Sequence, residues 1–364
     1  MKNFIRKFYP MRKKLKIAQI APLWFPIPPK KYGGTERIIS YLTEELIKRG
    51  HEVTLFASGD SKTKAKLVSV VKKGLISQGI PWHDYTWTGL NTGIAFKMAD
   101  KFDIIHSHWG FFSAFFQDFT KTPVLHTFHN IPRLNDHRWK ILKYYKKDLN
   151  VVFISHSEKR NSPIKFKKSW VVYNGINLSQ FKFNPKGGDH FIWVGRVDPC
   201  KGIENVIKVA EKTGIKLLLA GQIQEMRKDY FEKTIKPHLS KKIKYIGELT
   251  TEELSNFYGS AKACLYPIEW EEPFGLIMAE SMACGTPVIV FDRGSAREVV
   301  EDGKTGFVVK NIDEMIEAMK KIDKIDRFAC RQRVEKYFTY QRMVDDYEKI
   351  YYQISSFRRK RRWR

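Results

Sequence analysis

The sequence predicts an α/β protein with two successive Rossmann-like domains, and three observations support this fold class. Short apolar runs typical of buried strands alternate with helical patterns through both halves of the chain. A polar segment at 178–190, which contains Pro185, Gly187 and Gly188, is typical of a linker between the halves. The length of 364 residues, 43% of them apolar, is enough for two ordinary hydrophobic cores.

The first half opens with a strand-like run and a clear helical pattern. Apolar Ile38, Leu42 and Leu46 recur at the helical period, so we expect a helix over 35–49. Residues 58–90 mix polar, glycine and aromatic residues, and no element is assigned there. The strands that we expect to form a parallel sheet span 15–21, 52–57, 103–106, 123–126, 151–154 and 170–173.

The second half repeats this alternation after the linker. A final helical pattern covers 341–354. The strands expected in this half span 191–194, 216–220, 244–246, 263–266 and 287–291.

The net charge of +26 is concentrated at the two ends of the chain. Residues 1–16 carry seven Lys or Arg and residues 355–364 carry six, with no acidic residue in either segment. We therefore expect basic tails at 1–14 and 355–364. Such tails can bind an anionic membrane surface, bind nucleic acid without sequence preference, or only keep the protein in solution.

Several classes of protein are disfavoured by the sequence. No apolar stretch approaches the ~20 residues that span a bilayer, and residues 1–7 lack the apolar core of a signal peptide. We therefore expect a cytoplasmic protein. The four cysteines are dispersed without a C-x-x-C pair, which indicates reduced thiols and neither a disulfide framework nor a metal site.

The most informative stretch runs from Glu272 to Glu280. Pro273 suits the first turn of a helix, so the amides of 274–276 should be unpaired at the positive end of the helix dipole and form an anion site. Carboxylates accept hydrogen bonds from sugar hydroxyls, so the run fits a nucleotide sugar. Alternatively, Glu272 is a capping partner and Glu280 belongs to a solvated helix face.

A second loop has the chemistry of a phosphate site. The strand at 191–194 leads into Gly195-Arg196-Val197-Asp198-Pro199-Cys200-Lys201-Gly202 and then into a helix. Arg196 offers a planar fork and Lys201 a point charge for phosphate oxygens, although a basic loop by itself is often only solvated. In open α/β sheets, ligands bind at the carboxyl ends of strands, where both elements would lie.

Together these elements resemble retaining glycosyltransferases of family 4, also known as glycosyl transferases group 1, which have the GT-B fold. Glu272 to Glu280 resembles their E-x7-E motif and 195–202 their diphosphate loop, while 32–37 and 173–177 match further family segments. The resemblance covers 15–354 in the family's order. It implies two Rossmann-like domains that face a cleft.

The domain limits that follow from this resemblance are listed here: a basic tail at 1–14, an acceptor domain at 15–180, a nucleotide-sugar donor domain at 190–340, a helix at 341–354 that crosses back to the first domain, and a basic tail at 355–364.

The resemblance also implies roles for individual residues. Arg196 and Lys201 would hold the diphosphate, Glu280 the ribose hydroxyls and Glu272 the transferred sugar. His129 matches the family's active-site histidine, although it could be only a satisfied loop residue. The catalytic candidates are His129, Glu272, Arg196 and Lys201; the donor-binding candidates are Gly33, Gly34, Arg196, Lys201, Glu272, Phe274, Gly275, Leu276 and Glu280.

Two smaller features leave alternatives open. Gly33-Gly34 could let the backbone approach the ligand or form a plain turn. His106 and His108 share one face of a strand but lack a third ligand, so we expect no metal site.

Residues 138–147 combine Tyr144 and Tyr145 with flanking lysines, which suits an interfacial helix or an ordinary core-packed helix.

By this resemblance, the expected reaction is hexosyl transfer from a nucleotide sugar, first of all a UDP-sugar, with retention of configuration and without metal or other cofactor. The expected acceptor is a glycan or a lipid-linked glycan, which implies polysaccharide or glycolipid synthesis and favours a peripheral position on the inner membrane face. A nucleotide-sugar epimerase and a non-catalytic polyanion-binding protein are the alternatives. Nucleotide, sugar, acceptor, linkage and oligomeric state stay open.

Overall fold

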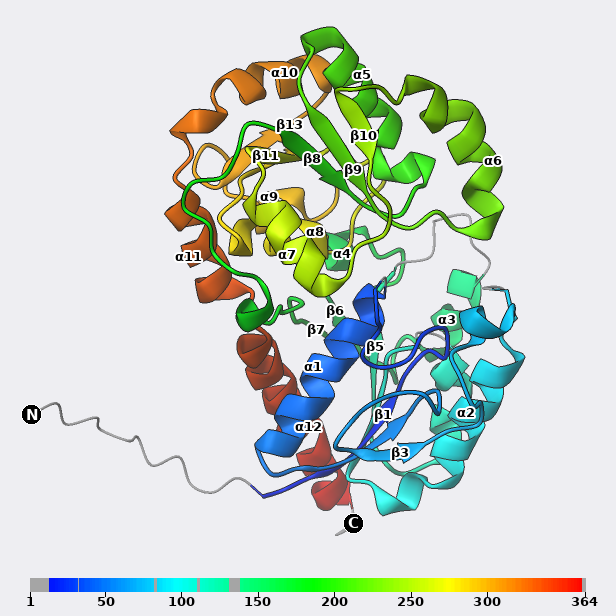
Figure 1. The fold of residues 1–364 in the computed structure, drawn as a ribbon. Coiled ribbons are helices and arrows are strands. Elements are labelled where there is room, and N and C mark those ends of the chain that lie inside the picture. The colour runs from blue at the N-terminus through cyan, green and yellow to red at the C-terminus, as the bar shows by residue number, and fades with distance from the viewer. Residues whose placement is uncertain (1–12, 32, 82–83, 110–111, 131–137, 362–364) are drawn as a thin grey trace, which may run out of the picture.

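The computed structural model describes residues 13–31, 33–81, 84–109, 112–130 and 138–361. Two parallel sheets with helices packed around them confirm the predicted α/β architecture. Figure 1 shows the unit built on the second sheet above the unit built on the first.

The first unit is a seven-stranded parallel sheet with the order β3-β2-β1-β4-β5-β6-β7. Its strands are β1 (Lys16–Ile20), β2 (Glu52–Phe56), β3 (Lys66–Val68), β4 (Ile104–Ser107), β5 (Val124–Phe128), β6 (Asn150–Phe153) and β7 (Lys168–Val171). Its helices are α1 (Gly34–Lys48), α2 (Thr86–Lys97), α3 (Arg138–Tyr145) and α4 (His156–Asn161).

The region that sequence patterns left unassigned contains β3 and the start of α2. The three-residue β3 is only half buried at the sheet edge, so it carries no alternating pattern. Helix α2 buries Thr88, Asn91 and Thr92, whose side chains bond to backbone carbonyls or pack inward. Because its inner face is largely polar, hydrophobic periodicity could not reveal it.

The second unit is a six-stranded parallel sheet with the order β10-β9-β8-β11-β12-β13. Its strands are β8 (Phe191–Val194), β9 (Leu217–Ala220), β10 (Ile243–Tyr245), β11 (Ala263–Tyr266), β12 (Val288–Phe291) and β13 (Gly306–Val309), of which only β13 was not assigned from sequence. Its helices are α5 (Ile203–Thr213), α6 (Lys228–Tyr230), α7 (Thr251–Gly259), α8 (Leu276–Ala283), α9 (Ala296–Val299), α10 (Ile312–Lys320) and α11 (Arg327–Tyr337).

The last helix, α12 (Tyr340–Arg361), returns to the first unit, as predicted, and runs beside α1 (Figure 1). Its buried Val344, Tyr347 and Tyr351 join Ile17 and Leu42 in the core of the first unit. The helix is longer than the predicted 341–354, so most of the segment predicted as a basic tail from 355 onward is helical. The predicted N-terminal tail lies outside the described residues, except for its last two positions.

Two chain crossings between the units lie side by side. The Ile176 amide donates to the Phe338 carbonyl (2.9 Å) and the Tyr340 amide to the Ile176 carbonyl (3.1 Å). Gly175 permits this approach, since a Cβ there would lie 2.4 Å from the Tyr340 Cα.

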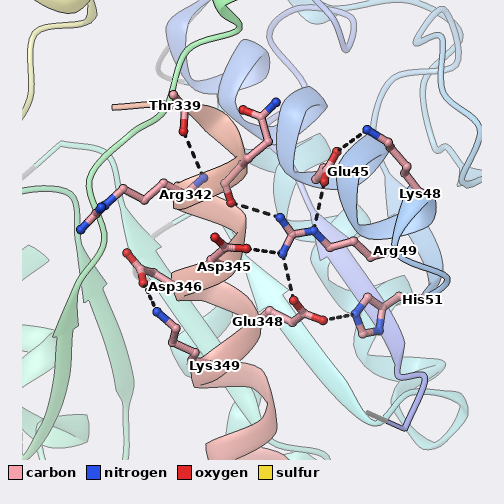
Figure 2. A network of polar contacts seen from close by, with 11 residues as sticks. Glu45, Lys48, Arg49, His51, Thr339, Arg342, Asp345, Asp346, Glu348 and Lys349 are labelled. Carbon is pink, nitrogen blue, oxygen red and sulfur yellow. Dashed lines mark hydrogen bonds and ion pairs between the residues drawn. The ribbon is translucent and has the colours of Figure 1, made fainter. Parts of the chain in front are cut away.

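Polar contacts anchor α12 to α1 (Figure 2). Arg49, at the end of α1, donates to Glu45 (3.1 Å), Asp345 (2.6 Å) and Glu348 (3.0 Å). His51 Nδ1 accepts from the Leu15 amide (3.1 Å), so its Nε2–H donates to Glu348 (3.0 Å). The bond to His51, followed by that to Arg49, lowers the pKa of the Glu348 carboxyl against the opposing effect of burial.

None of the helices described by the structure is long and apolar enough to cross a bilayer. Helix α3 packs Leu142 into the core and leaves Tyr144 87% exposed, an arrangement that fits both the core-packed and the interfacial helix.

Replacing Arg49 by alanine is expected to lower the free energy of unfolding by about 1–2 kcal/mol, because charge-assisted hydrogen bonds are lost at a partly exposed site. Urea unfolding measures the change. The control is Arg342→Ala on α12, whose guanidinium donates to the Lys336 carbonyl (3.1 Å) and lies 5.8 Å from the centre of the Tyr337 ring. Equal losses in both variants would show that the network does not hold α12.

Candidate active site

A cleft of about 420 Å³ lies between the two units and receives side chains from both. It is lined by the loops that follow β5 and β8 and by the start of α8. These loops leave the carboxyl ends of parallel strands, where α/β proteins bind ligands. All nine predicted donor-binding residues and the predicted histidine line it: Gly33, Gly34, His129, Arg196, Lys201, Glu272, Phe274, Gly275, Leu276 and Glu280.

Glu272 is held by three donors on a single carboxylate oxygen. Lys201 Nζ (2.7 Å), Tyr266 Oη (2.6 Å) and Trp270 Nε1 (3.0 Å) all donate to Oε2. Lys201 also lies 4.6 Å from the centre of the Trp270 ring. No described residue donates to Oε1, so this oxygen remains available to accept a hydrogen bond from a ligand in the cleft.

Helix α8 begins later than predicted. Its first residue is Leu276, and Gly275 precedes it with a φ of 74°. A Cβ at Gly275 would lie 2.5 Å from the Met278 methyl group, and the left-handed backbone favours glycine there. Pro273 therefore belongs to a loop and not to the first helical turn. The free amides of the first turn of α8 then belong to Leu276 and Ile277, and both residues line the cleft.

The loop after β8 supplies the two predicted cations. Gly202, in the left-handed region with a φ of 70°, ends the loop where a Cβ would meet the Pro267 carbonyl. Lys201 points to Glu272, while one Arg196 Nη lies 3.8 Å from Asp198. The buried Arg196 Nε has no hydrogen-bond partner within the part of the chain that is described.

Glu280 forms a buried ion pair that sequence patterns did not predict. Arg37 of α1 donates from Nη1 to Glu280 Oε1 (2.7 Å) and from Nη2 to the Lys31 carbonyl (3.0 Å). Tyr258 donates to the other carboxylate oxygen (3.1 Å). The carboxylate predicted to bind a ribose is therefore already linked to the first unit.

Gly34 brings the starts of two helices together. A Cβ there would lie 3.2 Å from the Leu276 side chain, so the start of α1 closely approaches the start of α8. Gly33 precedes α1 with a φ of 140°, and a Cβ there would lie 2.7 Å from the Pro29 ring. Gly34 therefore serves close packing between the units, whereas Gly33 serves the turn before α1.

His129 follows β5 and reaches the cleft from the first unit. Its Nε2 is hydrogen-bonded to His108 Nδ1 (3.1 Å). Burial lowers the pKa of His129 to about 4, so the ring is neutral near neutral pH. His106 and His108 are buried, and burial holds the pKa of each well below its usual range.

Two family models match the chain and together cover most of it. Residues 32–180 match the model described as Glycosyltransferase Family 4, and residues 176–337 match the one described as Glycosyl transferases group 1. The chain is a family 4 glycosyltransferase. This result confirms the family that the sequence motifs of the glycosyltransferase indicated.

Individual proteins agree with this assignment. An uncharacterized glycosyltransferase of Methanocaldococcus jannaschii is 27% identical over 91% of this chain and 94% of its own. A phosphatidyl-myo-inositol mannosyltransferase of Mycolicibacterium smegmatis is 24% identical over 81% of each chain. HepE of Anabaena, solved with UDP and glucose, superposes with a TM-score of 0.74 at 16% identity, covering 92% of this chain and 99% of its own, which supports the GT-B fold.

Sequence patterns missed several residues of this site. Tyr266 is the last residue of a predicted strand, and Trp270 lies two residues before Glu272, so proximity to the E-x7-E run was the available signal. Asn174 lines the cleft with a buried side-chain oxygen that lacks a partner among the described residues. Arg37 ends a segment that matches the family, but no local pattern indicated its contact with Glu280, because the two residues are far apart in sequence.

Among the described residues, no group of three or more His, Cys, Asp or Glu is arranged to hold a metal ion.

Glu36, in the first turn of α1, is expected to make stability depend on pH. Burial raises the pKa of this carboxyl to about 7, from an ordinary value of 4.5. The contribution of Glu36 to the free energy of unfolding is therefore fully present below pH 4.5 and is lost as the pH rises through 7. Replacing Glu36 by glutamine should relieve this loss, so the stability of the variant relative to the wild type should rise by roughly 3 kcal/mol between pH 4.5 and 8.

Urea unfolding at both pH values measures this difference. Glu52→Gln, at an exposed position of β2, is the control and should show no such trend. If the stability of Glu36→Gln relative to the wild type is the same at both pH values, Glu36 does not titrate as a buried acid.

Proposed function

We propose that this glycosyltransferase transfers a hexose from a nucleotide diphosphate sugar, most simply a UDP-sugar, to a glycan or lipid-linked acceptor with retention of configuration. The observation that carries the proposal is the arrangement around Glu272. Three donors fix the carboxylate through one oxygen and leave the other open, with Lys201 and the free amides of α8 at the same site. A sugar hydroxyl and a phosphate would thus find their partners side by side.

The cations of the loop after β8 would stabilise the leaving group. Negative charge grows on the diphosphate as the glycosidic bond breaks. Arg196, Lys201 and the start of α8 present fixed positive charge and amides in a partly buried cleft, where such groups act most strongly. With these groups neutralising the diphosphate, the proposed reaction requires no metal ion.

Glu280 would bind the ribose and share its carboxylate with Arg37. Each carboxylate oxygen has two lone pairs, so the bonds from Arg37 and Tyr258 leave acceptor capacity for ribose hydroxyls. Apolar Leu249 and Leu254 line the same cleft and would pack against the base. The nucleotide complexed with the Anabaena neighbour, UDP, supports a uridine nucleotide.

The acceptor would enter from the first unit, where His129 faces the cleft. His129 would orient the transferred sugar or contact the charge that develops on it. Closing the cleft would exclude water and limit hydrolysis of the donor. A relative named for mannosyl transfer to phosphatidyl-myo-inositol supports a lipid-linked acceptor, and the basic chain ends would bring the enzyme to an anionic membrane surface.

Lys201→Ala and Glu272→Ala are expected to lower turnover about 10²–10³-fold, because each removes a fixed charge at the reacting sugar or its leaving group. The purified protein is incubated with UDP-, GDP- and ADP-hexoses and membrane lipid extract, and nucleotide release is followed. Lys208→Ala is the matched control, since this exposed lysine lies on α5 just beyond the same loop. Near-normal turnover by a folded Glu272→Ala protein would contradict the site.

The same assay separates the alternative activities. Release of nucleotide with a glycosylated product supports transfer, whereas conversion of the donor to an isomer without release would indicate an epimerase. Absence of nucleotide binding in calorimetry would leave only a non-catalytic protein.

A protein that ends at Ser356 is expected to bind anionic vesicles less tightly than the full chain while binding the donor equally well. The truncation removes all six basic residues of the C-terminal segment and retains Ile354, which packs in the core of the first unit. Each basic residue near an anionic surface contributes about 1 kcal/mol.

Co-sedimentation with vesicles of phosphatidylserine and phosphatidylcholine measures this effect. Vesicles of phosphatidylcholine alone are the control for charge. Unchanged binding to the anionic vesicles would remove any anchoring role from this segment.

A further inference from the structure

A chain of hydrogen bonds runs from the cleft through the core of the first unit to α12. His129 Nε2 is bonded to His108 Nδ1 (3.1 Å), His108 Nε2 to Gln19 Oε1 (2.6 Å), and Gln19 Nε2 to Tyr351 Oη (3.2 Å). Gln19 and Tyr351 are fully buried and His108 is 3% exposed. The donor-binding contacts described above use none of these three residues.

The position of each hydrogen in this series of hydrogen bonds follows from the bond between Gln19 and Tyr351. The Gln19 amide nitrogen donates to Tyr351, which leaves its carbonyl oxygen facing His108. A carbonyl only accepts, so His108 Nε2 must carry the hydrogen. His108 Nδ1 then has only a lone pair, and the hydrogen between the two rings belongs to His129 Nε2.

A second series of hydrogen bonds, which starts at Tyr351, is consistent with these hydrogen positions. Tyr351 Oη lies 2.6 Å from His106 Nδ1, and His106 Nε2 lies 2.7 Å from Thr127 Oγ1. When the Tyr351 oxygen accepts from Gln19, its own hydrogen is free to be donated to His106. His106 then donates to Thr127, so every member of the branch is satisfied.

We propose that Gln19, His108 and Tyr351 are positioning residues that hold His129 in the tautomer with hydrogen on Nε2 and so reserve its Nδ1 as an acceptor for a substrate hydroxyl. No described residue is bonded to this Nδ1, and His129 lines the cleft. The part that concerns the substrate rests on the proposed function, whereas the tautomer does not. The low pKa values that burial gives to His108 and His129 keep both rings neutral, as the assignment requires.

The same series of hydrogen bonds makes the tautomer of His129 depend on α12. Tyr351 belongs to a helix that follows the second unit in sequence but packs in the first. Reversal of the hydrogen order would need the Gln19 amide turned around, with its nitrogen facing His108 and its oxygen facing Tyr351. In the structure the Gln19 amide donates to Tyr351, and this orientation of the amide sets the tautomer of a residue in the cleft.

The test compares Tyr351→Phe with Tyr347→Phe. Both tyrosines are fully buried on α12, but the Tyr347 hydroxyl meets Thr127 (3.1 Å) and lies outside the branch that leads to His129. Imidazole ¹⁵N NMR of the full chain reports the tautomer, with the His129 signals assigned by His129→Asn. We expect Nε2–H in the wild type and in Tyr347→Phe, and a mixture of tautomers in Tyr351→Phe.

Gln19→Met is the second variant, used because it preserves side-chain volume if Tyr351→Phe does not fold, and it should give the same mixture. An Nδ1–H signal in the wild type, or an unchanged tautomer in a folded Tyr351→Phe or Gln19→Met protein, would overturn the proposal.

Kinetics test the consequence for the substrate. With the donor found in the panel above, Tyr351→Phe should have a kcat roughly three- to tenfold below that of Tyr347→Phe, the range expected for one hydrogen bond. Equal kcat values would overturn the role of Nδ1 toward the substrate. If even the wild type shows no turnover, the proposed function fails, while the NMR comparison still decides the tautomer.

Discussion

The packing of α12 against the first unit is the constraint on which the cleft depends. The chain leaves the second unit beside the segment at which it entered, and α12 then buries its apolar side chains in the core of the first unit. Two adjacent segments of the chain thus connect the units. Helix α12, which follows the second unit in sequence, packs in the first unit and holds the two together. This arrangement turns the carboxyl ends of two parallel sheets toward one cleft.

Polar groups of the cleft are held before any ligand arrives. Glu272 receives three donors on one oxygen, and Glu280 receives Arg37 and Tyr258. Buried carboxylates without partners would be costly, so these contacts stabilise the fold while fixing the orientation of both acids. An environment already arranged in this way needs little reorganisation when charge develops on a leaving group.

The two units also share polar contacts around the cleft. Besides the pair formed by Arg37 and Glu280, Glu298 of α9 accepts hydrogen bonds from the His156 amide (2.8 Å) and the Tyr173 hydroxyl (2.8 Å) of the first unit. Lys31 donates to the Glu248 carbonyl (3.3 Å). Apolar contacts accompany these polar ones, since Ile154 of the first unit packs in the core of the second and Leu276 of α8 packs against both cores.

The sequence by itself determined the alternation of strands and helices, the two units and the motifs of the donor site. These features are local: apolar periodicity, glycine positions and the spacing from Glu272 to Glu280 are present in short stretches of chain. It placed the start of α8 too early, because the left-handed backbone at Gly275 is not evident from a proline that suits a first turn. It missed α2, whose buried face is largely polar.

Only the tertiary structure decided which groups meet. Arg37 and Glu280 are 243 positions apart, and Gln19 and Tyr351 are 332 apart, so no local pattern could pair them. The sequence named His129 as a candidate, but its tautomer depends on partners supplied by β1, by the residue that follows β4 and by α12. Residue type fixes what a side chain can donate or accept, whereas the fold decides which donor faces which acceptor.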